Sequence, residues 1–429
     1  MRAAAFLCAA AAFAQQPASD DVFARARARL AAAAASVPRY TCTETVDRSY
    51  FRETRQVARS CDAIVANRRS GRARPELVAT DRLRFDVEVA DGGYEIYAWP
   101  GAARIENQMV EQMSGGGPLG TGPFGPFLVD IFTNPAVEFQ SLGLKTGLFE
   151  YRYRVPLAAS HYLVQAGVKF HTTAYDGAFL LDPVTAELKH LTVRTLELPP
   201  DTASCEATTT MDFSPLRIGA ADYLVPRLTI LQVVARDSAS TENSTVYSDC
   251  HEFRAESIVR FDQPLSSAAN ASELPARDRP PTLPPGMPVE IALDSEIDTD
   301  RAAACDPVSG TIAKPLIDPA RRRVLVPAGA AVRGRITHLE HKLAGEKYFL
   351  VGISFQTLDF GGSSLPLAII LDASRQVLDP RSSHGRGVIT TESRSGFHGG
   401  GTFVFPSSAP RYVVPRGYTS HWITVPGAQ

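Results

Sequence analysis

The segment Phe149-Glu150-Tyr151-Arg152-Tyr153-Arg154-Val155 places an aromatic or apolar side chain at every second position. Alternate side chains of a strand point to opposite faces, so this pattern predicts a strand with one apolar and one polar face. Tyr175–Leu181 and Leu188–Thr195 follow, joined by Asp182-Pro183-Val184-Thr185. Proline presets the first corner of a tight turn, which indicates a β-hairpin. Residues 148–234 are therefore predicted to form an antiparallel meander whose apolar face needs a cover.

A helix over residues 19–36 is the predicted cover. Asp20 and Asp21 complement the positive end of the helix dipole, and Pro38 stops the helix soon after its last turn. One stripe of the helix is apolar, and such a stripe must pack on an apolar surface. A helix lying on a membrane surface is the alternative, but this stripe is mostly alanine, which binds lipid poorly. The stripe consists of Phe23, Ala26, Leu30, Ala33 and Val37.

Similar patterns predict the other elements. Short helices are expected at residues 102–113 and from about Phe124, on either side of a glycine-rich connector at 115–123. Strands are expected at residues 39–46, 82–89, 94–99, 207–213, 223–234, 245–261, 289–293, 323–326, 331–339, 348–358, 402–405, 411–414 and 422–425.

At 429 residues the chain is too long for one ordinary core, and two domains are expected. Periodicity is lost in the proline-rich residues 263–288, which predict a linker. The expected fold class is mainly β. An antiparallel half-barrel, with the N-terminal covering helix and two short helices, would occupy residues 15–262. A smaller C-terminal β-barrel would occupy residues 289–429, with residues 373–401 as a long excursion rich in Ser, Arg and Gly.

Charge and hydropathy exclude some classes of protein. The 44 basic and 46 acidic residues give a net charge of −2, without the basic excess that nucleic-acid binding requires. The sequence contains no run of eighteen apolar residues, so no transmembrane segment is predicted. Residues 1–14 resemble a signal peptide, with Arg2, a short apolar run and an Ala12-Phe13-Ala14 cleavage site. We therefore expect an exported protein, periplasmic or associated with the cell envelope.

In an exported protein the cysteines are expected to form disulfides, because thiols tend to pair in an oxidising compartment. Beyond the signal segment there are five, and none forms a C-x-x-C motif. The simplest scheme pairs Cys42 with Cys61 and Cys205 with Cys250, and leaves Cys305 outside both disulfides. Sequence alone does not determine the connectivity.

Aromatic side chains share the apolar parity of the predicted strands. They either fill a core, as burial of large apolar groups favours, or line a cavity for a lipid or acyl chain, and the two can coexist. The candidate cavity residues are Phe85, Phe149, Tyr151, Tyr153, Phe170, Phe179 and Phe213.

Catalytic, metal and cofactor motifs are not evident. His338 and His341 lie three apart in a strand pattern and point to opposite faces. The acidic run from Asp294 lacks the glycine and the final glutamate of a calcium loop. No G-x-S-x-G motif occurs, and the other strand histidines are expected to be solvated. A hydrolase would require a Ser or Cys within reach of a histidine in a cleft. Those histidines are His161, His171, His190 and His251.

Two sequence segments resemble segments of proteins with the lipoprotein-carrier (LolA/LolB-like) half-barrel fold. They are Gly177-Ala178-Phe179-Leu180-Leu181-Asp182-Pro183-Val184-Thr185, and Tyr223-Leu224-Val225-Pro226 after Ile218-Gly219. The resemblance implies a non-catalytic protein that shields acyl chains in a cavity or serves as an envelope scaffold. Residues 326–336, Val-Pro-Ala-Gly-Ala-Ala-Val-Arg-Gly-Arg-Ile, are faintly similar to TrbI-like β-barrel modules.

The functional hypothesis is an exported, non-catalytic envelope protein that binds a lipid or another hydrophobic ligand in the half-barrel. The alternative is a structural or protein-interaction module of the bacterial envelope with a filled core and envelope proteins as partners. An apolar cavity of a few hundred cubic ångströms would favour the first, and a filled interior the second.

Overall fold

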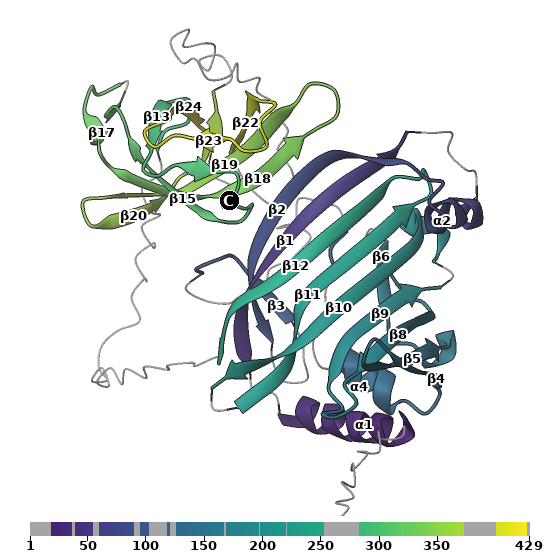
Figure 1. Ribbon diagram of the computed structural model, residues 1–429. Coiled ribbons are helices and arrows are strands. Elements are labelled where there is room, and N and C mark those ends of the chain that lie inside the picture. The colour runs from purple at the N-terminus through teal and green to yellow at the C-terminus, as the bar shows by residue number, and fades with distance from the viewer. Residues whose placement is uncertain are drawn as a thin grey trace, which may run out of the picture.

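The computed structural model describes residues 19–36, 39–54, 60–89, 95–102, 118–120, 126–166, 169–196, 198–219, 221–252, 283–318, 320–372 and 400–426. The described chain is mainly β, as predicted (Figure 1). The expected signal peptide, the helix at 102–113, most of the linker and most of the excursion at 373–401 lie outside these residues. Among the described helices, none has the length and apolar character needed to cross a bilayer.

Strands from the first part of the chain form one open antiparallel sheet. Its two ends are the short β4 and β3, and its longest strands lie in the middle (Figure 1). The spatial order is β4 (Glu138–Lys145), β5 (Leu148–Val155), β8 (Tyr175–Leu181), β9 (Leu188–Thr195), β10 (Ser204–Ile218), β11 (Ala221–Ala235), β12 (Ser240–Glu252), β1 (Tyr40–Glu53), β2 (Pro75–Val89) and β3 (Glu95–Ala98). A separate hairpin pairs β6 (Leu163–Ala166) with β7 (Lys169–Thr172).

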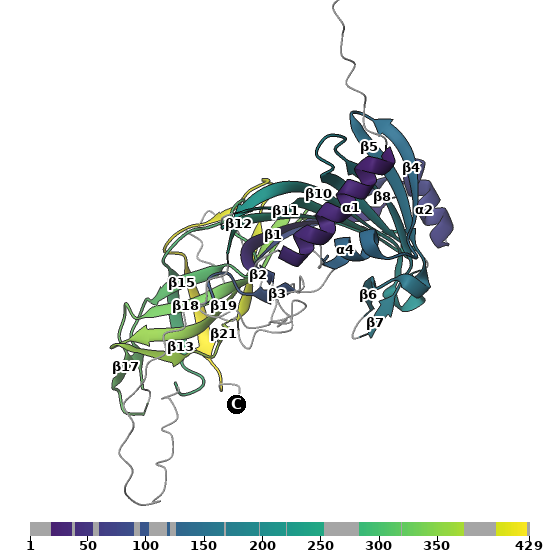
Figure 2. The same cartoon turned by 90° about the horizontal axis from the view of Figure 1, so that it is seen from below.

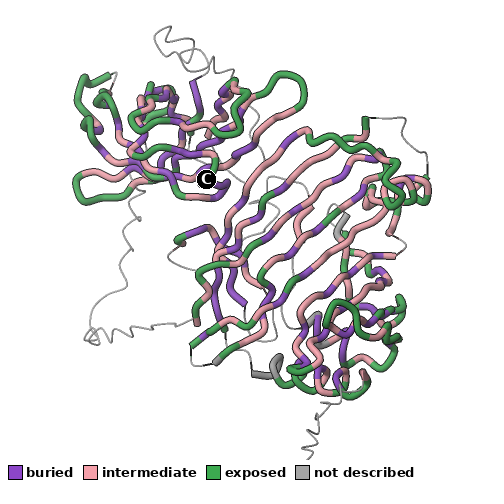
Figure 3. Tube along the Cα trace, viewed as in Figure 1, coloured by how far each residue is buried: buried purple, intermediate pink, exposed green. Residues whose placement is uncertain are grey.

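Burial alternates along these strands as the sequence pattern predicts (Figure 3). In β5, Tyr151 and Tyr153 are buried while Arg152 and Arg154 are exposed. Cross-strand partners share a face. Over β5, β8 and β9 the inner face therefore holds aromatic and other apolar side chains, and the outer face holds the charged ones.

The predicted covering helix is α1 (Ser19–Ser36), which lies beside α4 (Pro126–Thr133) on the inner face (Figure 2). Val22, Ala26 and Leu30 of α1 are buried. Two of the three arginines of α1 hydrogen-bond to the turn after β8: Arg25 donates to the carbonyls of Pro183 and Val184. Arg29 donates to the Thr185 carbonyl at 2.6 Å.

Strands after residue 283 close into a ring, so the C-terminal segment folds as a small barrel. The circuit is completed by hydrogen bonds of Gly400 with Ile369 and Leu371, and by a parallel bridge between Ile370 and Gly400. The order is β22 (Gly401–Pro406), β19 (Tyr348–Phe360), β18 (Ala331–Lys342), β15 (Pro307–Ile312), β13 (Pro288–Leu293), β24 (Thr419–Thr424) and β21 (Ile369–Leu371). Smaller pairings join β14 (Ile297–Asp298) to β23 (Val413–Val414), β16 (Leu316–Ile317) to β17 (Val324–Val326), and β20 (Ser363–Pro366) to β19.

The ring and the open sheet share hydrogen bonds, because the end of β18 pairs with β2. Beside this seam, Arg48 is 3% exposed and donates two 2.6 Å hydrogen bonds to the Asp81 carboxylate. Asp81 pairs in register with Glu340 of β18. Although burial alone would raise it, hydrogen bonds from His338 and Lys342 lower the pKa of Glu340 to about 2. A buried charge network therefore lies where the two groups of strands meet.

The disulfides connect Cys42 with Cys250 and Cys61 with Cys205, so the predicted pairing was wrong. The prediction joined cysteines close in sequence. In the fold, β12 returns beside β1 and brings Cys250 to Cys42. Cys61 begins α2 (Cys61–Arg69), which packs against β10 and so meets Cys205. Cys305 is buried and belongs to neither disulfide, as predicted.

Candidate functional site: a charged depression on the outer face

Five of the seven predicted cavity residues lie in one buried core beneath α1 and α4. Their rings pack on one another: the Tyr151 and Phe179 centroids are 5.0 Å apart, and Phe23 of α1 lies 5.3 Å from Tyr151. Phe132 of α4 lies 4.9 Å from Phe179. These rings pack on one another between the sheet and the two helices. The five residues are Phe149, Tyr151, Tyr153, Phe179 and Phe213.

The other two residues lie elsewhere. Phe85 is buried in a second core, formed on the inner face of β1, β2 and β3. Phe170 is 61% exposed, so its prediction as an inward-facing residue was wrong. The reason is topological, since β7 pairs only with β6 among the described strands and does not share the parity of the main sheet.

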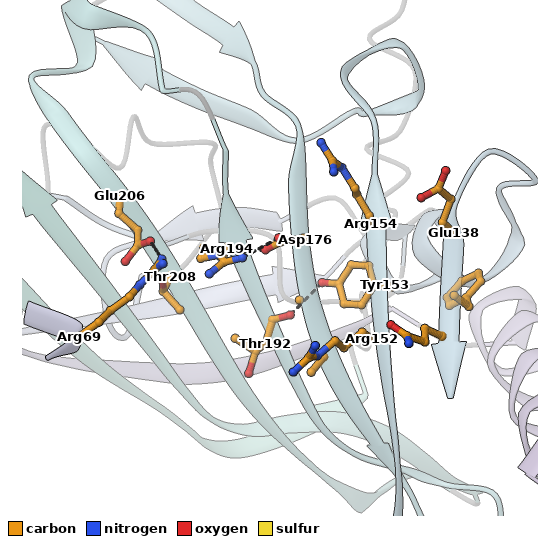
Figure 4. A pocket seen from close by; sticks show the side chains of 14 residues that line it. Arg69, Glu138, Arg152, Tyr153, Arg154, Asp176, Thr192, Arg194, Glu206 and Thr208 are labelled. Carbon is orange, nitrogen blue, oxygen red and sulfur yellow. Dashed lines mark hydrogen bonds and ion pairs between the residues drawn. The ribbon is translucent and has the colours of Figure 1, made fainter. Parts of the chain in front are cut away.

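The outer face of the sheet carries a depression of about 860 Å³ over β4, β5, β8, β9 and β10 (Figure 4). Register places one charged row across these strands: Glu138 opposite Arg154, Arg154 opposite Asp176, and Asp176 opposite Arg194. The C-terminal residue of α2, Arg69, reaches the same depression. Four arginines and three carboxylates line it: Arg69, Arg152, Arg154 and Arg194 with Glu138, Asp176 and Glu206.

Ion pairs neutralise part of this lining. Arg194 donates two hydrogen bonds of 2.8 and 2.6 Å to the Asp176 carboxylate, and Arg69 forms an ion pair with Glu206 (Figure 4). Arg152 and Arg154 are exposed, and neither forms an ion pair with a described residue. The depression therefore presents two available guanidinium groups, which bind carboxylate and phosphate oxygens through planar pairs of N–H donors.

Sequence reasoning missed this surface because it followed the apolar parity of the strands. The signal was present in the same segment, where Arg152 and Arg154 alternate with the tyrosines. What the sequence does not show is the register that aligns them with Asp176 and Arg194.

One side-chain arrangement beside the depression bears on catalysis. His190 Nδ1 lies 2.7 Å from Asp212 Oδ1, and Thr192 Oγ1 lies 3.3 Å from His190 Nε2. This is the contact pattern of a nucleophile, a base and an orienting acid. The backbone of β9 around it is hydrogen-bonded to β8 and β10 on its two sides. Strand N–H groups are thus committed to the sheet rather than directed at an oxyanion.

The other candidate metal and catalytic residues take part in local pairs. His338 contacts Glu340, whereas His341 stacks on Phe349 with centroids 3.9 Å apart. Asp298 is buried and accepts two hydrogen bonds from Arg411. His161 and His171 hydrogen-bond to carboxylates, and His251 to a backbone carbonyl. Within the described residues, no three His, Cys, Asp or Glu side chains form a group that could hold a metal ion.

Comparison of the chain with protein-family models, with curated proteins and with solved structures found no match.

Proposed function

We propose that this chain is an exported, non-catalytic interaction module of the cell envelope, whose partner docks in the charged depression. The observation that carries the proposal is the distribution of polarity. The aromatic rings of the candidate lipid cavity pack on one another. The depression on the opposite face, by contrast, is lined by charged side chains. The two disulfides between distant parts of the chain suit an oxidising compartment.

The chemistry of the depression indicates the kind of partner. With Asp176 and Glu206 paired, Arg152 and Arg154 are the cations left for a partner. An acidic protein segment complements them, and such contacts increase association rates and specificity. Beside them lies β4, which pairs with β5 on one side and with no described strand on the other. An extended segment of the partner could add to this edge by backbone hydrogen bonds.

Site-specific photocrosslinking in cells that export the protein tests the proposal. A photoreactive residue replaces Gln140, which lines the depression, or Lys314, an exposed residue of the ring, as the matched control. We expect a discrete crosslinked protein from position 140 and none from position 314. Arg152→Glu with Arg154→Glu should abolish the crosslink, and Arg152→Lys with Arg154→Lys should retain it. Identical products from both positions, or products insensitive to charge reversal, would contradict the proposal.

Lipid carriage stays a prediction and is the rival. It requires an acyl chain to enter the aromatic core, where the side chains of Tyr151, Phe179 and Phe132 already contact one another. Co-purifying acyl species would favour it over docking.

A further inference from the structure

On the opposite face of the same sheet, Glu44 of β1 has a buried carboxyl group whose two oxygens have no hydrogen-bond partner among the residues that the structure describes. The residue is 0% exposed. Buried polar groups in folded proteins are almost always hydrogen-bonded, so such an exception requires an explanation. Sheet register places Glu44 between Phe85 of β2 and Tyr247 of β12, all on the inner face.

Aromatic rings and a second carboxyl surround Glu44. Tyr97 packs edge-on against Phe85 with centroids 5.9 Å apart, and its hydroxyl donates to Glu95 at 2.7 Å. Burial, and then the Glu44 and Glu95 carboxyls, raise the pKa of Tyr97 well above its ordinary value. Burial, Glu44 and Glu95 likewise raise the pKa of Tyr247. Both tyrosine hydroxyls therefore lie within electrostatic range of both carboxyl groups.

These groups together have the chemistry of an organic-cation site. A carboxylate supplies the countercharge, and the faces of tyrosine and phenylalanine rings attract ammonium and guanidinium groups. The available oxygens accept hydrogen bonds, so the missing partner is a donor. A metal ion is a poorer fit, because two carboxyls surrounded by aromatic rings do not provide a full coordination shell.

Two neighbours of Glu44 extend toward the surface, since Tyr247 and Glu95 are partly exposed.

We propose that Glu44 is the anionic centre of a binding site for a small organic cation, with Glu95, Tyr97, Tyr247 and Phe85 as its surroundings. The inference is independent of the docking proposal, since it concerns the other face of the sheet. On binding, the Glu44 carboxyl releases its proton to solvent and the carboxylate pairs with the cation. Without the cation, burial and then the Glu95 carboxyl raise the pKa of Glu44 well above its ordinary value.

Titration calorimetry of the full chain with ethylammonium and with tetramethylammonium tests the proposal, with tert-butanol as an uncharged control. We expect at least one cation to bind, tert-butanol not to bind, and the bound cation to release protons that appear as a dependence on buffer ionisation enthalpy. Glu44→Gln, which keeps the shape of the side chain, should weaken binding about tenfold or more and remove the proton release. Glu290→Gln, in the ring and paired with Lys314, is the control that should bind as the wild type does.

Three outcomes would overturn the inference. The first is that neither cation binds the wild-type protein, which would leave Glu44 a buried group served by water. The second is that Glu44→Gln binds as tightly as the wild type. The third is that tert-butanol binds as well as tetramethylammonium, which would indicate apolar filling alone. Circular dichroism of Glu44→Gln, compared with the wild type, separates lost binding from lost folding.

Discussion

Tyr153 of β5 lies across from Gly177 of β8, and its hydroxyl donates over that glycine to the Thr192 carbonyl of β9 at 2.9 Å. A Cβ at position 177 would lie 1.8 Å from Thr192 O and 2.9 Å from Tyr153 Cε1. The absence of a side chain at Gly177 thus lets the Tyr153 ring pack across the inner face of β8. The two faces are separated by a single layer of backbone.

Gly177→Ala should therefore destabilise the protein. Neither the backbone carbonyl nor the packed tyrosine can yield without disturbing the sheet, so the loss should reach about 1–3 kcal/mol or more. Chemical denaturation measures it. Ala178→Gly, at the neighbouring outward-facing position, is the comparison and should cost less than the inward change. Equal stability of Gly177→Ala and wild type would show that the ring does not pack as described.

Removing either disulfide should lower the free energy of unfolding by about 2–5 kcal/mol, because each closes a long loop of the unfolded chain. The loops span 144 residues for Cys61–Cys205 and 208 for Cys42–Cys250. Peptide mapping without reductant should recover these two cross-linked pairs. A peptide joining Cys42 to Cys61 would contradict the fold, because Cys61 lies in α2 against β10 and Cys42 lies in β1 beside β12.

The seam between sheet and ring should depend on Arg48. Arg48→Ala leaves the nearly buried Asp81 carboxylate without its two hydrogen bonds, and the expected loss is about 3–5 kcal/mol. Arg333→Ala removes a pair whose arginine is 71% exposed, and should cost about 0–1 kcal/mol. Comparable losses in thermal unfolding of the two variants would mean that the buried pair has no special role at the seam.

Glu44 predicts a specific pH dependence of stability. Its folded-state pKa lies above the ordinary value of 4.5, so the folded protein holds the proton more tightly than the unfolded chain. The stabilising contribution is fully present below that value and is lost as pH rises toward the folded-state pKa. Near neutral pH, Glu44→Gln should therefore be at least as stable as wild type. Its stability should fall less than that of the wild type between pH 4.5 and neutrality, and chemical denaturation of both proteins across this range measures the difference; an equal fall would contradict the prediction.

The His190–Thr192 contact predicts no hydrolytic activity. We expect His190→Ala and Thr192→Ala to hydrolyse an activated aryl ester at the wild-type rate, because the β9 backbone around the pair is hydrogen-bonded to β8 and β10. A fall of about 10²-fold in either variant, the usual effect of losing a general base, would assign catalysis to this pair.

Sequence pattern predicted the elements better than their connections. The bounds of α1 were predicted to the residue, and the tight turn after β8 follows from Asp182 and Pro183, where Asp182 Oδ1 accepts from Val184 N and Thr185 N. Which side chains of one strand share a face can be predicted from the sequence of that strand alone. The prediction for Phe170 was wrong because the sequence of β7 does not show which strand pairs with it.

Long-range pairing also explains the remaining differences. Cys42 meets Cys250 because β12 returns beside β1, and the outer charged row exists because the registers of three strand pairs coincide. Glu44 sits on the apolar parity of β1, between Cys42 and Val46. An acidic residue at such a position is the kind of local inconsistency that marks a candidate site in a sequence.

Native mass spectrometry of the exported protein, purified without detergent, tests most directly whether the inner aromatic core is closed to lipid. The account predicts the mass of the chain with two disulfides and no acyl-bearing adduct, before and after incubation with phospholipid vesicles. A stoichiometric lipid adduct that disappears when Phe179 is replaced by Trp would contradict it, because the core beneath α1 would then be a lipid cavity.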